Sequence, residues 1–140
     1  GSKNYIELIN RLNKKNNFFF FLLCGPSERN IADEILKQID PDSCLSLHNK
    51  KISEIVPLIS QTNMYIGNDS FGHHITSQCG IPSIVIMLDT PKAYTDYSVK
   101  QLRVLPEGIK ENDITHDSNF SPDSISVEKV IDRANSILKL

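Results

Sequence analysis

The stretch MYIGNDSFGHHIT, residues 64–76, is the most informative part of this chain for its fold. An apolar segment at Met64–Gly67 is followed by a polar turn and then by residues with helical spacing. This pattern predicts a buried strand that passes directly into a helix. The first N–H groups of such a helix have no partner inside it, and the helix dipole is positive there. The junction is therefore suited to bind an anion such as phosphate.

The segments on either side of this stretch alternate between helix and strand. Apolar residues at helical spacing predict helices at 4–15, from Ser27 to about 39, at 52–59, from 70 to about 79 and from about Ser126 onward. Continuous apolar runs predict strands at 18–23, 64–67 and 83–88, with a weaker strand at 43–47 and a further short strand at 102–105. Pro57 falls inside one helix and should cost it a hydrogen bond or kink it.

This alternation predicts an α/β fold, a Rossmann-like parallel sheet with helices on both of its faces. Such sheets bind ligands beyond the carboxyl ends of their strands. Three turns are expected at that edge: Gly25–Glu28, Asn68–His74 and Asp89–Tyr97. A ligand site is therefore expected among them.

The bulk properties of the chain narrow its class. Its 140 residues, of which 39% are hydrophobic and 23% charged, are expected to form one domain over residues 3–140. Gly1 and Ser2 are typical of a cloning remnant, so we expect a deliberately cut part of a longer protein. The net charge of −2, without clustered Lys and Arg, argues against a nucleic-acid partner.

The sequence also indicates a cellular compartment. The apolar run at residues 18–23 is shorter than the roughly 20 residues that span a bilayer, and no signal peptide is visible. Cys24, Cys44 and Cys79 have no CxxC spacing and are expected to be small buried thiols. Free thiols of this kind favour a reducing cytoplasm.

Asp69 and Ser70 have two interpretations. In the simpler one, either side chain caps the helix and does nothing more. In the other, the first N–H groups bind phosphate, which gives a reason for Gly72, a residue that weakens a helix but lets a ligand approach the backbone. His74 lies one turn after Ser70 on the same helix face and would add a hydrogen bond to the anion.

His73 and His74 are not expected to form a metal site. Neighbouring positions of a helix point about 100 degrees apart, so the two imidazoles cannot easily bind one ion. One of the two is expected to be structural or merely exposed. We expect neither a metal nor another cofactor.

Two further turns carry candidate residues. Glu28 either complements the dipole of its helix or accepts hydrogen bonds from ribose or sugar hydroxyls. Thr90 either belongs to a plain turn or donates to a phosphate. Gly25-Pro26-Ser27 is not a P-loop, because the Gly-Lys-Ser/Thr ending is missing, and no Gly-x-Gly-x-x-Gly follows any strand.

These motifs, in this order, resemble glycosyltransferase family 9, the ADP-heptose:lipopolysaccharide heptosyltransferase family, and in particular its C-terminal nucleotide-sugar-binding half. The family pattern is a strand ending in Asn-Asp-Ser/Thr-Gly-Pro-x-His, then Gly-x-Pro, an apolar strand and a Thr-x-Pro-like loop. The matching segments are residues 66–70 with His74, 80–82, 83–88 and 90–91, together with GPSER at 25–29 and ISVEKV at 125–130. The chain departs from the pattern with Phe71 for Gly, Gly72 for Pro and Leu88 for Gly.

The resemblance implies the C-terminal half of a GT-B fold and a metal-independent, inverting glycosyltransferase. The diphosphate of the donor would lie on the N–H groups of Ser70, Phe71 and Gly72, with His74 and Thr90 beside it. Asp69 would cap the helix and lie near the sugar. Glu28, with Gly25, would hold the ribose of the nucleoside.

The resemblance also implies partners and a location. The acceptor would be lipopolysaccharide or a related surface glycan, bound by an N-terminal domain that this chain lacks and that would hold the general base. The fragment alone is therefore expected to be inactive. The full-length enzyme would lie in the cytoplasm at the inner face of the bacterial inner membrane, with peripheral contact to it.

Two alternatives remain at the level of the sequence. One is a stand-alone nucleotide- or anion-binding module of flavodoxin-like shape without catalysis. The other is a related GT-B catalyst, such as a sugar-nucleotide epimerase, which would need its own acid and base in the cleft.

Overall fold

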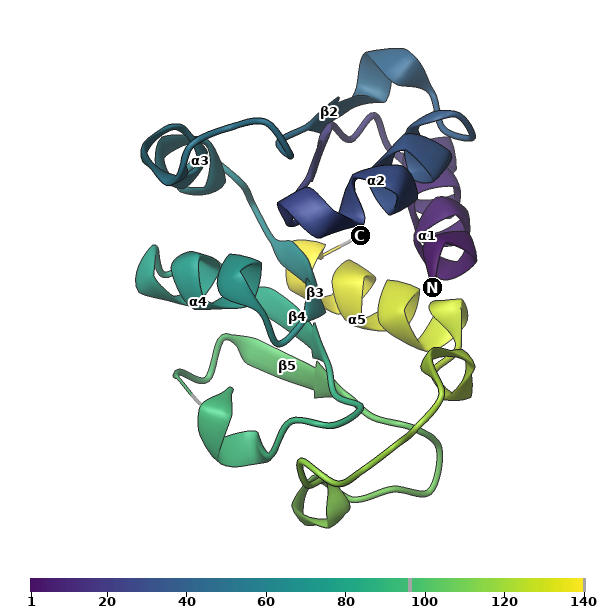
Figure 1. Ribbon diagram of the computed structural model, residues 1–140. Coiled ribbons are helices and arrows are strands. Elements are labelled where there is room, and N and C mark those ends of the chain that lie inside the picture. The colour runs from purple at the N-terminus through teal and green to yellow at the C-terminus, as the bar shows by residue number, and fades with distance from the viewer. Residues whose placement is uncertain (96, 140) are drawn as a thin grey trace. The chain divides into compact units, whose positions relative to one another are not determined.

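The computed structural model shows a chain of alternating helices and parallel strands (Figure 1). The structure describes residues 1–95 and 97–139, with the backbone alone at Lys15. The chain divides into two compact units, Gly1–Ile55 and Val56–Leu140. The boundary falls inside the helix α3, Ile52–Ile59, which contains Pro57 as the sequence predicts.

The first unit is built on two short parallel strands. Its elements are α1 Ser2–Lys15, β1 Phe20–Leu22, a 3-10 turn Pro26–Glu28, α2 Arg29–Leu36, a 3-10 turn Pro41–Ser43 and β2 Cys44–Ser46. In the ladder, Phe20 lies opposite Cys44 and Leu22 lies opposite Ser46. α1 packs against α2, and Ile9, Ile35 and Ile39 form a buried cluster with side chains of both strands.

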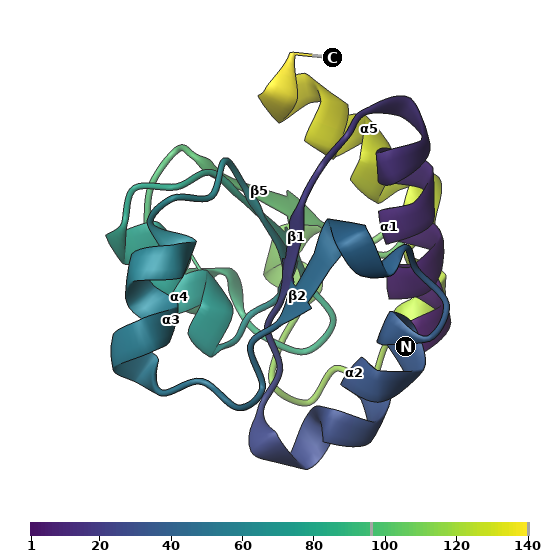
Figure 2. The same cartoon turned by 90° about the horizontal axis from the view of Figure 1, so that it is seen from above.

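The second unit contains a three-stranded parallel sheet in the order β3-β4-β5. Its elements are β3 Tyr65–Asn68, α4 Phe71–Gln78, β4 Ser83–Ile86, a 3-10 turn Lys92–Tyr94, β5 Gln101–Val104, the 3-10 turns Glu111–Asp113 and Pro122–Ser124, and α5 Val127–Leu138. α4 packs against β3 and β4, whereas α5 packs against β4 and β5. Both views place the sheet between these two helices (Figure 2).

The predicted fold class is confirmed, because the strands are parallel and helices flank them. The strands form two ladders, one in each unit; β1, β2 and β4 are shorter than predicted, whereas β3 and β5 keep the predicted length and are shifted by one residue. The predicted stop after α4 is also confirmed: Cys79 is the C-cap residue, and Gly80 follows with a φ of +71°, a backbone conformation that favours glycine.

Two local predictions are wrong. Ser27 does not cap a helix, because it lies inside the 3-10 turn that Gly25 begins, and Glu28 is the N-cap residue of α2. α2 ends at Leu36 rather than just before Asp40, because a turn replaces its last expected residues. The carboxylate of Asp40 instead accepts from the N–H of Asp42 at 3.1 Å and caps the following 3-10 turn.

The three cysteines are free thiols, each half-buried rather than fully buried as expected. Burial raises the pKa of Cys24 and of Cys44 above the ordinary value. Both are therefore protonated near neutral pH, which suits a role in packing.

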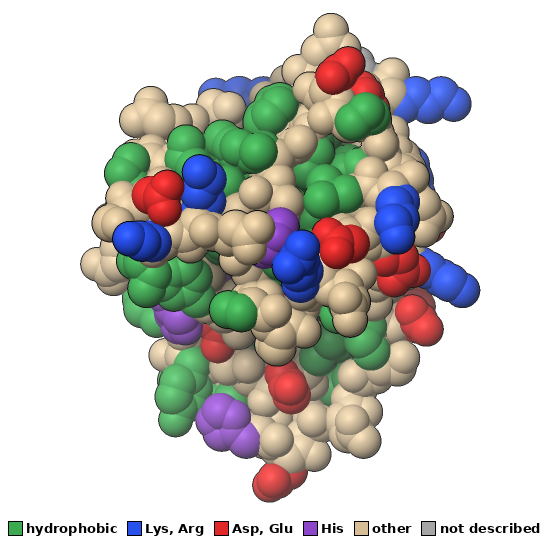
Figure 3. Space-filling model, turned by 45° about the horizontal axis from the view of Figure 1, so that its top comes forward, with side chains coloured by type: hydrophobic (Ala, Val, Ile, Leu, Met, Phe, Trp, Pro, Cys, Tyr) green, Lys and Arg blue, Asp and Glu red, His purple; other side chains and the backbone are tan. Residues whose placement is uncertain are grey.

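The surface mixes charges of both signs. On the face drawn in Figure 3, basic and acidic side chains are interspersed with hydrophobic ones, and neither sign forms a continuous patch there. Among the described residues, no helix combines the length and the apolar character that a membrane crossing requires.

Candidate functional site

The strand register of the second unit places three strand ends level with one another. Asn68 pairs with Ile86, and Ile86 pairs with Val104, at the carboxyl ends of β3, β4 and β5. The segments that follow these residues therefore leave from one edge of the sheet. That edge is where parallel sheets bind their ligands.

The turn between β3 and α4 is shaped by Tyr65 and Gly67. The Tyr65 hydroxyl donates to the Asn68 carbonyl at 3.1 Å and lies 3.2 Å from the Ser70 hydroxyl. A Cβ atom on Gly67 would lie 2.7 Å from Cζ of Tyr65, a distance that real Cβ atoms do not tolerate. Glycine at position 67 therefore allows the Tyr65 ring to fold back and fasten the turn.

The N-terminus of α4 carries no side-chain cap. Ser70 is the N-cap residue, its backbone is extended, and its carbonyl accepts from the N–H of His74 at 3.1 Å. Its hydroxyl, however, makes no capping hydrogen bond. The interpretation of Asp69 or Ser70 as a plain cap is thus wrong, and so is the capping role that the resemblance implies for Asp69. The reason is that Ser70 faces Tyr65 instead.

The residues around this N-terminus differ in exposure. Ser70 and Phe71 are exposed, whereas Gly72 and His73 are buried. The Phe71 side chain, which stands where the family pattern has glycine, is 43% exposed. Solvent or a ligand therefore reaches the first turn of α4 from the side of Ser70 and Phe71.

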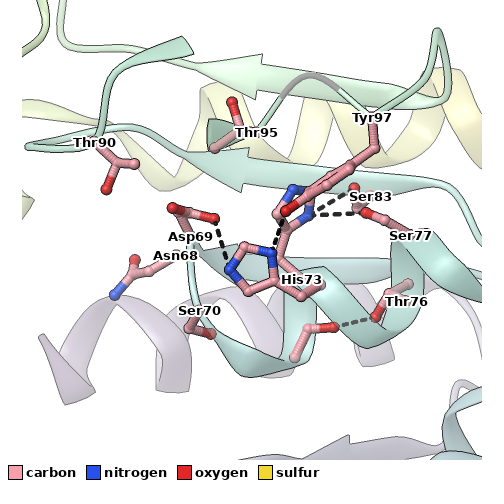
Figure 4. Close-up of polar contacts among 12 residues, drawn as sticks. Asn68, Asp69, Ser70, His73, Thr76, Ser77, Ser83, Thr90, Thr95 and Tyr97 are labelled. Atoms are coloured by element: carbon pink, nitrogen blue, oxygen red, sulfur yellow. Dashed lines mark hydrogen bonds and ion pairs between the residues drawn. The ribbon is translucent and has the colours of Figure 1, made fainter. Parts of the chain in front are cut away.

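Asp69, His74 and Tyr97 form a connected group at this edge. Figure 4 labels Asp69 and Tyr97 and marks the contacts of this group with dashed lines. Nε2 of His74 lies 3.6 Å from Oδ1 of Asp69, and Nδ1 of His74 lies 2.6 Å from the Tyr97 hydroxyl. The Asp69 side chain is 11% exposed and that of His74 is 46% exposed. His74 thus links a largely buried carboxylate to the surface.

His73 is a structural residue. It is completely buried, with Nδ1 3.3 Å from the Ser83 hydroxyl and 3.5 Å from the Ser77 hydroxyl. Burial lowers the pKa of His73 below its ordinary 6.5, and the nearby charge of Asp69 offsets part of that effect. The ring is therefore neutral at pH 7. Across residues 1–95 and 97–139, no three His, Cys, Asp or Glu side chains form a group that could hold a metal ion.

Thr90 lies on the loop that leaves β4. Its hydroxyl is 3.4 Å from Oδ1 of Asp89, at the outer limit of a hydrogen bond. A neighbouring carboxylate opposes an anion, so the arrangement by itself does not favour a phosphate at Thr90.

The same loop is anchored by a polar cluster that the sequence did not reveal. Thr95 is completely buried and accepts from Nε of Arg103 at 2.9 Å. The Arg103 side chain is 8% exposed and lies 3.9 Å from Glu111, which pairs with Lys92 at 3.1 Å. An arginine inside the apolar segment QLRVL was the available signal. The turn Asp89–Tyr97 was predicted at this edge, but nothing in the sequence paired Tyr97 with His74, which lies 23 residues away along the chain.

Glu28 and Gly25 lie in the first unit and interact with each other. Oε2 of Glu28 accepts from the N–H of Gly25 at 2.7 Å, and the N–H of Glu28 donates to the Gly25 carbonyl at 3.0 Å. The carboxylate thus caps its own turn. Its interpretation as a complement to the start of α2 fits this geometry, and a contact with ribose stays a prediction.

Comparisons with known proteins agree with this architecture. Residues 2–119 match the family model described as "Glycosyltransferase family 9 (heptosyltransferase)". A solved structure titled "Structure of E. coli ADP-heptose lps heptosyltransferase II" has a similar fold, with a TM-score of 0.78 and 18% sequence identity. The similarity covers 99% of this chain and 41% of that protein. None of the curated proteins matches the chain.

Proposed function

Because this chain belongs to glycosyltransferase family 9, we propose that its second unit binds the diphosphate of a nucleotide-sugar donor at the N-terminus of α4. The observation that supports this most directly is the uncapped start of α4. Ser70 leaves the first-turn N–H groups without a side-chain acceptor, and the helix begins at the carboxyl edge of the sheet. Such a helix end attracts phosphate through its N–H groups and its dipole.

The proposed chemistry is stabilisation of a departing nucleoside diphosphate. Negative charge grows on the diphosphate as the bond to the sugar breaks, and fixed donors aimed at that charge lower the barrier. The N–H groups at Ser70, Phe71 and Gly72 are the proposed donors, and His74 is the proposed polar side chain. The proposal includes inverting transfer without a metal ion, with these groups supplying the stabilisation that a metal gives elsewhere.

Asp69 and His74 are proposed to act together. A carboxylate close to the anion would oppose its binding, but the His74 ring contacts Asp69 through Nε2. The imidazole N–H can donate either to this carboxylate or to a phosphate oxygen. His74 is therefore proposed to let an acidic residue and a diphosphate share this edge.

Two further contacts are proposed for the donor. In the first unit, Glu28 would accept from a ribose hydroxyl through Oε1, since Oε2 already accepts from Gly25. Gly25 would thus orient the carboxylate. In the second unit, Thr90 would donate to a phosphate oxygen after turning away from Asp89.

The reaction of the whole protein is proposed from the family. The solved structure that this chain resembles is titled as an ADP-heptose lipopolysaccharide heptosyltransferase, and the chain spans 41% of its length. We propose an ADP-heptose-like donor and an acceptor of the lipopolysaccharide type, at the cytoplasmic face of the inner membrane. In this proposal the 140 residues bind the donor, whereas the acceptor site and the general base are provided by residues outside them.

The test is calorimetric titration of ADP, GDP and UDP into the chain and two variants. ADP is expected to bind best, and His74→Ala should weaken its binding about tenfold through loss of a charge-assisted hydrogen bond. His116→Ala is the matched control, because His116 is exposed and its ring contacts that of Tyr94 edge-on instead. The proposal fails if no nucleotide binds or if the two variants behave alike. Pyrophosphate binding as tightly as ADP would favour a general anion-binding module.

A further inference from the structure

We propose that Tyr97 is a positioning residue that holds His74 in the tautomer with its hydrogen on Nε2. The inference rests on the proposed function, because it assigns a role to Tyr97 at the same diphosphate site. It adds a residue that lies outside the α4 junction, on the loop between β4 and β5.

The two contacts of His74 determine which nitrogen carries the hydrogen. A carboxylate accepts hydrogen bonds and donates none, so the approach of Nε2 to Oδ1 of Asp69 requires a hydrogen on Nε2. That oxygen is buried and has no hydrogen-bond partner among the described residues, so Nε2 is the donor aimed at it. In the neutral ring, Nδ1 is then the acceptor, and the Tyr97 hydroxyl donates to it at 2.6 Å.

The loop that carries Tyr97 is fixed two residues earlier. The Thr95 hydroxyl donates to the Lys92 carbonyl at 3.1 Å and accepts from Nε of Arg103 at 2.9 Å. Glu111 contacts both Lys92 and Arg103. These contacts tie the loop to β5, and the Tyr97 ring lies 5.6 Å from the His74 ring in an edge-on arrangement.

This arrangement leaves the Nε2–H group of His74 available to an anion. With Nδ1 occupied by Tyr97, Nε2–H faces Asp69, and its 3.6 Å separation is longer than a good hydrogen bond. A phosphate oxygen at the start of α4 can therefore compete for Nε2–H at small cost. Without the Tyr97 hydroxyl, only the long contact to Asp69 still favours a hydrogen on Nε2, so the tautomer with its hydrogen on Nδ1 gains population and fewer molecules present that donor.

The tautomer is measurable by NMR at pH 8, where neutral histidine predominates. The chain has four histidines, so selective ¹⁵N labelling of histidine gives a simple long-range ¹H–¹⁵N spectrum, and His74→Gln identifies the His74 signals. Wild-type His74 is expected in the Nε2–H form, and Tyr97→Phe should shift it toward a mixture. Tyr94→Phe is the control, because Tyr94 is also an exposed loop tyrosine but contacts His116.

A second variant and a ligand titration complete the test. Thr95→Val removes the hydroxyl that Arg103 contacts and should shift the tautomer in the same direction, but less. ADP binding should weaken roughly two- to tenfold in Tyr97→Phe, as for loss of one hydrogen bond. Unchanged signals of His48 and His116 would show that these variants are folded; His73 is not used for this purpose, because its ring lies 5.5 Å from that of Tyr97.

The outcomes separate the two proposals. If the wild type binds ADP while Tyr97→Phe changes neither the tautomer of His74 nor the affinity, the positioning role is wrong and the proposed function stands. If Tyr97→Phe shifts the tautomer but the wild type binds no ADP, Tyr97 positions His74 and the proposed function is wrong.

Discussion

Two strand-to-helix junctions in this chain share a sequence pattern but differ in where their polar side chains point. After β1, Glu28 turns back and accepts from the N–H of Gly25, so the carboxylate caps its own turn. After β3, Ser70 faces Tyr65 instead of its own helix, and the start of α4 keeps no side-chain cap. The polar side chain of the first junction hydrogen-bonds within its own turn and that of the second does not, although neither α2 nor α4 has a side-chain cap at its N-terminus.

The comparison teaches that a polar residue before a helix does not by itself define an anion site. The decisive feature is a neighbour that draws the capping side chain away. At the second junction that neighbour is Tyr65, and the glycine at position 67 makes room for it. We expect the contrast between the junctions to appear in both binding and stability.

The largest effect is expected from Ser70→Asp, which makes the second junction resemble the first. The new carboxylate would cap α4 and place a negative charge where the diphosphate is proposed to bind. ADP affinity should fall about a hundredfold, because facing like charges cost several kcal/mol, whereas stability should hold or rise slightly. Ser70→Asn, which caps without charge, should weaken binding less. Equal ADP affinity for wild type and Ser70→Asp would break the comparison.

The next effect is expected from Gly67→Ala. Its Cβ atom would displace the Tyr65 ring and with it the contacts to Asn68 and Ser70. Unfolding in urea should show a loss of about 1–2 kcal/mol, as for overpacking at a tight contact. In a Tyr65→Ala background the added methyl group meets no ring, so the same substitution should cost much less. Equal costs in both backgrounds would contradict this account of the turn.

A third prediction compares the two caps directly. Glu28→Ala removes a side-chain cap and should destabilise the protein by about 1 kcal/mol. Ser70→Ala removes a hydroxyl that caps nothing, so its cost should stay within about 0.5 kcal/mol, as for an ordinary surface change. Both are measured by urea unfolding, and a larger cost for Ser70→Ala would reverse the comparison.

The smallest expected effect is on the pH dependence of stability. It arises from the buried imidazole of His73, in the first turn of α4. His73 has a lowered pKa in the folded protein, so the unfolded chain binds a proton at this residue more readily. The contribution of neutral His73 to the free energy of unfolding is complete above the unfolded pKa of about 6.5. It is lost as the pH falls below that value. Between pH 7.5 and pH 5.5, the urea midpoint should fall less in His73→Asn than in the wild type. His116→Asn is the control.

The sequence predicted much of the fold because its main signals are local. Apolar runs and helical spacing identified the strands and helices. The predicted strand at 64–67 and the predicted helix start at 70 each differ by one residue from β3 and α4 in the structure. The ends of the elements were predicted less well: Ser27 was expected to be the N-cap of a helix whose N-cap residue is Glu28, and that helix has no side-chain cap. Ser27 lies instead inside the 3-10 turn that precedes the helix, and this turn is closed by the Glu28 carboxylate and the N–H of Gly25.

The site was only partly predictable for the same physical reason. Asp69, Ser70 and His74 are adjacent in sequence, so a helix start brings them together without knowledge of the tertiary structure. Tyr97 reaches His74 because the β4–β5 loop folds back over that edge, and the anchor on this loop depends on a buried arginine. Contacts set by loop geometry leave no periodic signal in a single sequence.

The central claim is that the start of α4 binds the diphosphate of a nucleotide. NMR titration of the ¹⁵N-labelled chain with ADP tests it most directly, because each backbone N–H reports on its own surroundings. The account predicts that the largest shifts fall on the amides of Ser70, Phe71 and Gly72, and that adenosine without phosphates leaves these amides unmoved. Saturable ADP binding that leaves those three amides in place would contradict it.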